Sequence, residues 1–265
     1  MLTNKRLKDY TIHATDGELG SVSELFFDDE TWAVRYIVVD TGGWLSGRKV
    51  LISPYSVIRV DPDCARLDVT LTKRQVENSP DIDTHAPISR QHEAAYLGYY
   101  GYPYYWSGPN LWGPAFFPAG VAVVEPASTE DMARSIRSES ADSHLRSTEA
   151  VTGYYMEASD GEIGHVDGFV IDAAAWAIRY LEVATRNWLP GKKVLVSPEW
   201  IERISWKESK VHTGLSIQAI KSAPEYIESR PVIREYESQL HSHYGRPPYW
   251  LHHAQHNAQY AMSGD

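Results

Sequence analysis

Short apolar or alternating runs, separated by turn residues, fill the first part of the chain. Residues 10–15 predict a short strand, and Asp16-Gly17 is a strong signal for a hairpin turn into a second strand over about 18–27. Residues 32–39 are rich in β-branched and aromatic side chains, as is typical of a central strand. Further strands are expected at 49–52, 57–60 and 67–71. Six short strands without long helices between them favour a small antiparallel barrel or sandwich.

The strand pattern ends at Thr72, where a different signal begins. Thr72-Lys73-Arg74-Gln75 has the form of a capping box, so we expect a short helix that Pro80 ends. An extension rich in aromatic residues then runs to Trp106.

The whole pattern returns 144 positions later in the chain. Asp16-Gly17-Glu18 recurs as Asp160-Gly161-Glu162, and the segment that starts at Trp32 recurs at Trp176. Pairing residues 10–106 with 154–250 at this single offset leaves roughly a third of the positions identical, with a period too long for a solenoid. The sequence therefore predicts a mainly β protein of two tandem small antiparallel β-barrels, each with a short C-terminal helix and an aromatic extension.

The repeat also predicts the domain boundaries. Residues 1–106 form the first module with its extension, 107–150 a linker, 151–250 the second module with its extension, and 251–265 a histidine-rich tail. The first half of the linker is rich in Gly, Pro and aromatic residues, and its second half is rich in Ser with mixed charge. Such composition favours an irregular connection rather than a third core.

Composition and charge narrow the possible partners. Nine Trp and seventeen Tyr against five Phe indicate half-buried surfaces and interfaces, because these side chains are amphipathic. The net charge of −10 argues against nucleic acid or an anionic membrane as the main partner. Cys64 is the single cysteine, so no intramolecular disulfide is expected and cytoplasmic residence is predicted. The longest uncharged run, 94–124, contains four prolines, so no spanning helix is expected there.

These residues resemble the PRC-barrel family, named for the cytoplasmic domain of the photosynthetic reaction-centre H subunit and also found in the ribosome maturation factor RimM. The matching features are the Asp-Gly-Glu-x-Gly hairpin, the acidic turn at Asp28 or Asp172, the Trp-x-x-Arg-Tyr strand and the Lys-Val-Leu-x-Ser-Pro segment. They cover about residues 5–83 and 149–227. The resemblance implies a bacterial or archaeal double-barrel protein without the membrane-spanning helix of the H subunit.

The resemblance also implies a non-enzymatic adaptor or regulatory scaffold, which binds another protein through barrel edges and aromatic extensions. The candidate partner-binding residues are Tyr99, Tyr100, Tyr102, Tyr104, Tyr105, Trp106, Tyr249 and Trp250. The same aromatic run can instead wrap over its own barrel or fill the groove between modules, and the sequence leaves both possibilities open. Another alternative is a peripheral subunit of a membrane photosynthetic or redox complex.

A second hypothesis concerns metal binding at the C-terminus. If residues 250–261 are helical, His252 and His256 lie four residues apart on one face, a spacing that can hold a transition metal. The alternative is a solvated tail whose histidines are incidental. No other cofactor is expected.

Two strand arginines, Arg35 and Arg179, are candidates for binding a carboxylate or phosphate. We favour structural ion pairs for both. The acidic candidates are Asp28 and Glu18 in the first repeat and Asp172 and Glu162 in the second. The repeat also predicts equivalent, largely buried positions for Trp32 and Trp176.

Catalytic motifs are incomplete in this sequence. His92-Glu93 starts like the helix of a zinc protease, but Tyr96 stands where the second histidine is required. No P-loop, dinucleotide fingerprint or nucleophile elbow is present. We therefore do not expect an enzyme.

Overall fold

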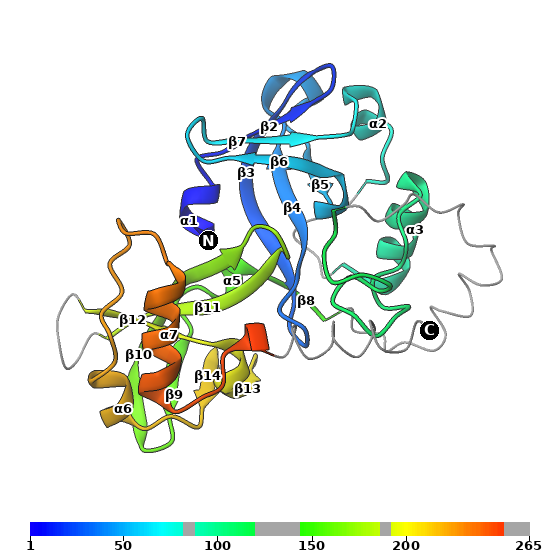
Figure 1. Ribbon diagram of the computed structural model, residues 1–265. Helices are drawn as coiled ribbons and strands as arrows, with labels where there is room; N and C mark the ends of the chain where they lie inside the picture. Colours follow the sequence, from blue (N-terminus) through cyan, green and yellow to red (C-terminus); the bar gives the residue numbers. More distant parts are fainter. Residues whose placement is uncertain (82–87, 120–143, 186–191, 252–265) are drawn as a thin grey trace, which may run out of the picture. The chain divides into compact units, whose positions relative to one another are not determined.

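The computed structural model describes residues 1–81, 88–119, 144–185 and 192–251 (Figure 1). Within these residues the protein is mainly β, with two sheets of seven strands each and few helices. This arrangement confirms the predicted fold class and fits two β-barrel-like units.

The first sheet follows the strands that the sequence predicts. Its order is β5-β4-β3-β2-β7-β6, and β8 pairs with β3 outside that path. Its strands are β2 (Thr11–Ala14), β3 (Gly17–Asp28), β4 (Val34–Asp40), β5 (Lys49–Ile52), β6 (Val57–Asp61), β7 (Arg66–Val69) and β8 (Leu145–Ser147). The pairing is antiparallel except between β2 and β7, which run parallel.

The second sheet has the same order 144 residues later. It runs β12-β11-β10-β9-β14-β13, and β1 pairs with β10. Its strands are β1 (Leu2–Thr3), β9 (Tyr155–Ala158), β10 (Gly161–Asp172), β11 (Ala177–Ala184), β12 (Lys193–Val196), β13 (Ile201–Ser205) and β14 (Lys210–Thr213). As in the first sheet, one pair is parallel, here β14 with β9. The two repeats of the sequence therefore share one strand topology.

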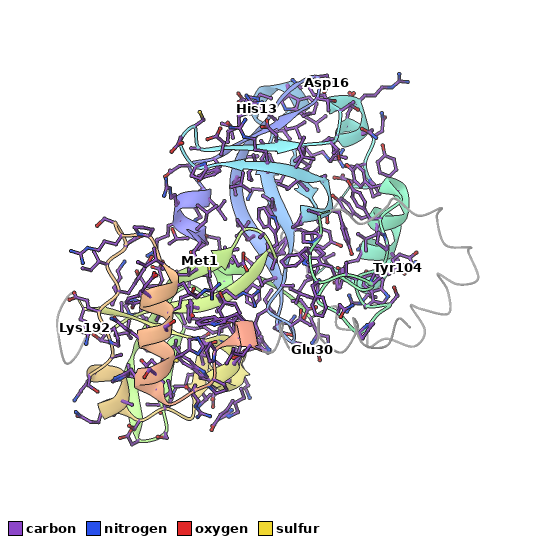
Figure 2. All side chains as sticks on the ribbon, in the orientation of Figure 1. Met1, His13, Asp16, Glu30, Tyr104 and Lys192 are labelled. Atoms are coloured by element: carbon purple, nitrogen blue, oxygen red, sulfur yellow. The ribbon has the colours of Figure 1, made fainter. Side chains whose placement is uncertain are left out.

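A short helix follows each run of strands, and the hairpin aspartate of the same repeat caps it. The capping box predicted at Thr72 is present, and α2 (Lys73–Glu77) begins directly after it. Asp16 Oδ1 accepts a 2.8 Å hydrogen bond from the backbone N–H of Lys73, and Figure 2 shows Asp16 beside α2. In the second repeat, Asp160 Oδ1 accepts from the N–H of Ile217 over 2.7 Å, at the start of α6 (Ile217–Lys221). The Asp-Gly hairpin thus acts as a turn and a helix cap.

A longer helix begins each aromatic extension. These helices are α3 (Arg90–Tyr100) and α7 (Arg234–Tyr244), and each ends at a glycine in the left-handed conformation, Gly101 or Gly245. Ala94, Tyr96 and Leu97 of α3 join a core cluster with side chains of β3, β4 and β5. The extension is therefore part of the folded module.

By contacts, the chain divides into two compact units. The first unit comprises Leu2–Thr152 together with Gly168–Arg179, and the second comprises Gly153–Asp167 and the chain from Tyr180 onward, with Met1. The first unit thus includes the turn between β10 and β11 as well as two short helices, α1 (Asn4–Leu7) and α5 (Thr148–Val151). None of the helices among the described residues is long and apolar enough to cross a membrane.

Part of the segment that the sequence assigns to a linker packs into the first unit. Trp112 is fully buried, and its indole N–H donates a 2.8 Å hydrogen bond to the carbonyl of Ala175. Its ring also meets that of Tyr55 edge to face, at 5.0 Å between ring centroids. A Gly- and Pro-rich composition concealed this anchor, because a single buried tryptophan has no periodic signal. The helix expected around 130–138 lies outside the described residues.

The two repeat tryptophans occupy equivalent turn positions with unequal burial. Trp32 and Trp176 have φ angles of 59° and 49°, in the left-handed region that few large residues adopt. Trp176 is buried as predicted, whereas Trp32 is half-buried and stacks on Phe27 at 5.3 Å between ring centroids.

Candidate functional site

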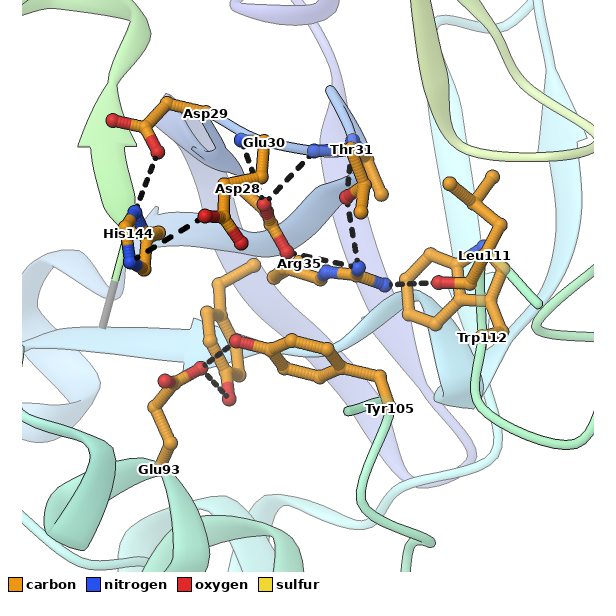
Figure 3. Close-up of polar contacts among 12 residues, drawn as sticks. Asp28, Asp29, Glu30, Thr31, Arg35, Glu93, Tyr105, Leu111, Trp112 and His144 are labelled. Atoms are coloured by element: carbon orange, nitrogen blue, oxygen red, sulfur yellow. Dashed lines mark hydrogen bonds and ion pairs between the residues drawn. The ribbon is translucent and has the colours of Figure 1, made fainter. Parts of the chain in front are cut away.

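The most highly connected polar group in the first unit is the carboxylate of Glu93 on α3, shown in Figure 3. Its Oε1 accepts hydrogen bonds from the hydroxyls of Tyr105 and Tyr36, over 2.5 and 3.1 Å. Its Oε2 lies 2.9 Å from Nη1 of Arg90, which also donates to the Tyr105 hydroxyl over 2.7 Å. One turn of α3 places Arg90 and Glu93 on the same face, so that both reach Tyr105.

Burial dominates the electrostatics of this cluster. Glu93 is 1% exposed, and burial raises the pKa of its carboxyl to about 7, even though Arg90 and the two tyrosine hydroxyls stabilise the charged form. Burial and the neighbouring carboxylate also raise the pKa of Tyr36 and of Tyr105 well above 10. Both hydroxyls therefore stay protonated and act as donors.

The second repeat contains the same cluster within the second unit. Glu237 Oε1 accepts from the hydroxyls of Tyr180 and Tyr249, over 3.1 and 2.9 Å, and Arg234 Nη1 lies 3.1 Å from Glu237 Oε2. His241 occupies the position of Leu97 in the first repeat, and its Nε2 lies 3.1 Å from the hydroxyl of Tyr180. Two copies of one cluster, each joining an extension to a barrel strand, fit a structural role.

Arg35 on β4 forms a second buried polar cluster in the first unit. Its Nη2 lies 3.0 Å from Asp28 Oδ2 and donates to the Thr31 hydroxyl over 3.0 Å, while Nη1 donates to the carbonyl of Leu111 over 2.6 Å. The guanidinium carbon lies 3.8 Å from the centroid of the Tyr105 ring. Arg35 therefore links β3, β4 and the extension, as Figure 3 shows.

The predicted ion pairs of the strand arginines are confirmed in both repeats, with aspartate as the partner. Arg179 Nη2 lies 3.2 Å from Asp172 Oδ2, which matches the Arg35 pair in the first repeat. Burial opposes the charge on Asp28, but Arg35 and two backbone N–H groups outweigh it and hold the pKa of Asp28 below its ordinary value.

Tyr96 explains why the zinc-protease pattern in α3 is not a metal site. Its hydroxyl donates to the carbonyl of Leu51 over 2.9 Å and accepts from the N–H of Ser53 over 3.1 Å. The residue at the required histidine position therefore attaches α3 to the end of β5.

The structure separates the aromatic candidate residues into two groups. Tyr104, Tyr105 and Tyr249 are buried within their own units, whereas Tyr99 is 42% exposed. The half-buried members are Tyr100, Tyr102, Trp106 and Trp250. The guanidinium groups of Arg90 and Arg234 lie over the rings of Trp106 and Trp250, at 4.4 and 4.0 Å from their centroids. Most of these side chains thus contact their own module.

Sequence reasoning missed an apolar groove beside β6 in the first unit. The groove has a volume of about 430 Å³ and is lined by Val57, Ile58, Arg59 and Val60 of β6, with Phe117 and Trp176 among the facing residues. Ile58 is 66% exposed and Phe117 is 50% exposed, which is unusual for large apolar side chains in one place. Alternating apolar residues in β6 were visible in the sequence, but the facing residues lie far away along the chain.

The candidate metal ligands His252 and His256 lie outside the described residues, so their interactions stay a prediction. In the described ranges, no three His, Cys, Asp or Glu side chains are grouped so that they could hold a metal ion.

Comparison with known proteins identifies the first repeat. Residues 3–72 match the PRC-barrel domain family, which confirms the resemblance over that segment. A stretch of 61 residues is 39% identical to an uncharacterised protein of Deinococcus radiodurans and covers 23% of this chain and 22% of that relative. The chain thus matches less than a quarter of that relative's length.

Proposed function

We propose that this chain is a non-enzymatic adaptor or regulatory scaffold of the PRC-barrel type, which binds another protein at β6 and the groove beside it. The observation that carries this proposal is the pair of exposed apolar side chains, Ile58 and Phe117, on either side of a groove of about 430 Å³. Exposed apolar surface at a groove is typical of a protein-interaction site.

The position of β6 favours an extended partner segment. β6 ends the strand order of its sheet and pairs with β7 on one side. The other edge is free of strand partners among the described residues, and such an edge can accept a further strand from another protein.

The chemistry of the groove specifies that segment further. Apolar walls from β6 and Phe117 favour an aliphatic or aromatic side chain, and Arg59 is the charged residue that lines the groove. The Arg59 side chain is 67% exposed beside Asp61. We therefore infer a partner segment in extended conformation, with an apolar anchor and a nearby carboxylate that meets Arg59.

The buried polar clusters support a structural rather than a catalytic assignment. The carboxylates of Glu93 and Glu237 each accept hydrogen bonds from two tyrosine hydroxyls and pair with one arginine of the same helix. The shared strand order supports the further proposal that the second repeat is a second PRC-type barrel.

Site-specific photo-crosslinking in the native cells tests this proposal. A photoreactive amino acid placed at position 58 or 117 of the full chain should crosslink to one protein, and the same probe at Tyr155 should not. Tyr155 is a matched control because it is 50% exposed and belongs to the second unit.

The purified crosslinked protein then serves as the ligand in a binding titration. Ile58→Asp should weaken its binding at least about tenfold, since a buried carboxylate without a partner would enter an apolar contact. Tyr155→Asp should leave binding unchanged. Crosslinks that are equally strong from position 155, or a normal affinity for the Ile58→Asp chain, would refute the groove as the binding site.

A further inference from the structure

The short N-terminal segment of each repeat pairs with a strand of the other repeat. In β1, Leu2 and Thr3 stand opposite Ile171 and Val170 of β10. In β8, Arg146 and Ser147 stand opposite Phe27 and Phe26 of β3. The two sets of pairs are related by the same 144-residue offset, and all of these residues lie in the first unit.

The helix that follows each segment repeats the exchange with a side chain. Asn4 Oδ1 in α1 accepts a 2.8 Å hydrogen bond from the backbone N–H of Phe169. Thr148 Oγ1 in α5 accepts from the N–H of Leu25 over 3.2 Å. Positions 4 and 148 are equivalent in the repeat, as are 25 and 169, and both side chains are buried. The exchange therefore includes polar contacts as well as strand pairing.

A third pair of contacts lies at the two turns before β4 and β11. The N–H of Val34 donates to the carbonyl of Trp176 over 2.7 Å, and the N–H of Ile178 donates to the carbonyl of Trp32 over 2.8 Å. Each bond is the image of the other under the offset, as in the contacts of a two-fold dimer.

The exchanged segments complete strands that would otherwise have a free edge. The N-terminal half of β3 pairs with β2, whereas β8 covers Phe26–Asp28 on the side opposite β4. Each N-terminal segment also carries two buried apolar anchors, Leu2 and Leu7 in one repeat and Leu145 and Val151 in the other. Separation of the repeats would expose these anchors and leave backbone groups unpaired.

We propose that the chain is a fused dimer in which each repeat is completed by the N-terminal segment of the other. The partner that fits each acceptor strand is thus a second repeat of the same kind. The connection between the repeats keeps the two partners at high effective concentration, while the exchanged segments hold them together.

Engineered disulfides in the full chain distinguish exchange from pairing within a repeat. In a Cys64→Ser background, Thr3→Cys with Val170→Cys should form a disulfide, because these residues are Cα partners in the structure. The matched control is Thr3→Cys with Phe26→Cys, which would form a bond only if the segment paired with its own repeat. A protease site introduced between residues 120 and 143, cleaved after folding, makes the result visible on non-reducing gels.

The exchange predicts that oxidation joins the two fragments covalently in the first variant and leaves them separate in the control. Disulfide formation in the control but not in the first variant would overturn the proposal. Disulfide-linked dimers of the uncut chain would place the exchange between copies and would also overturn it. The cleaved chain without added cysteines should elute as one complex in size exclusion, and separation into two folded monomers would likewise contradict a fused dimer.

Discussion

The hydroxyl of Tyr105 donates a 2.5 Å hydrogen bond to Oε1 of Glu93, and so the end of the aromatic extension is joined to the helix that begins it. Both side chains are buried. The extension therefore closes on itself over the barrel, with Arg35 of β4 stacked on the Tyr105 ring. This closure explains why much of a conspicuously aromatic run faces inward.

Replacement of Glu93 by Gln should change the pH dependence of stability. The pKa of Glu93 is raised from 4.5 to about 7 in the folded protein, so folding favours the protonated carboxyl. Its contribution to the free energy of unfolding is complete below about pH 4.5 and is lost as the pH rises through about 7. Urea unfolding of Glu93→Gln at pH 5, 6 and 7.5 should lack this loss, which amounts to roughly 2–4 kcal/mol in the parent chain.

The control for this experiment is Glu77→Gln, at an exposed position on α2. It should retain the pH profile of the parent. If the Glu93→Gln and parent chains lose equal stability between pH 5 and 7.5, the raised pKa of Glu93 is wrong.

Loss of Arg35 should destabilise the protein far more than loss of its counterpart Arg179. The side chains of Arg35 and Asp28 are 2% and 8% exposed, so Arg35→Met leaves a buried carboxylate unpaired, at a cost of about 3–5 kcal/mol. The side chains of Arg179 and Asp172 are 13% and 24% exposed, and water can replace part of that pair. We therefore expect Arg179→Met to cost about 1 kcal/mol in urea unfolding at pH 7. Equal losses would show that burial does not set the strength of these pairs.

The local elements of this fold were predictable because each depends on residues close together in the chain. The Asp-Gly hairpin, the capping box at Thr72 and the Arg35–Asp28 ion pair all join positions within seven residues of each other. The duplicated topology followed from the repeat at a single offset. Such signals need no knowledge of tertiary packing.

The exchanged segments and the groove could not be predicted in the same way. β1 and β8 are two and three residues long, too short for any periodic pattern, and their partners lie more than a hundred residues away. Burial of Tyr104 and Tyr105 was equally hidden, because tyrosine is compatible with a surface, an interface or a core. These features depend on contacts between distant segments, for which one sequence gives no direct signal.

Gly20 and Gly164 should be intolerant of alanine. A Cβ at either position would lie 2.0 Å from a backbone carbonyl oxygen, that of Asp40 or of Ala184, where β3 and β10 approach the ends of their neighbours. We expect Gly20→Ala and Gly164→Ala each to lower the free energy of unfolding by about 1–3 kcal/mol or more. Gly43→Ala is the control, since a Cβ there has no heavy atom within 4 Å, and it should change stability by less than about 0.5 kcal/mol. Similar losses in all three variants would contradict the close approach.

His241→Leu should reduce the acid sensitivity of the second unit, because the first repeat already carries Leu97 at this position. Burial lowers the pKa of His241 below 6.5, although the Pro247 carbonyl and nearby acidic residues favour its charged form. The folded state thus favours the neutral imidazole, and stability is lost as the pH falls below about 6.5.

The leucine variant should keep the core of the cluster. Tyr180 still donates to Glu237, and the hydrogen bond lost is that from His241 Nδ1 to the carbonyl of Pro247. We expect a change within about 1 kcal/mol at pH 7.5 and a gain relative to the parent chain at pH 5. The measurement is the difference in unfolding free energy between the two chains at each pH, because Glu93 contributes the opposite slope to both. A difference that does not depend on pH would show that His241 titrates equally in the folded and unfolded states.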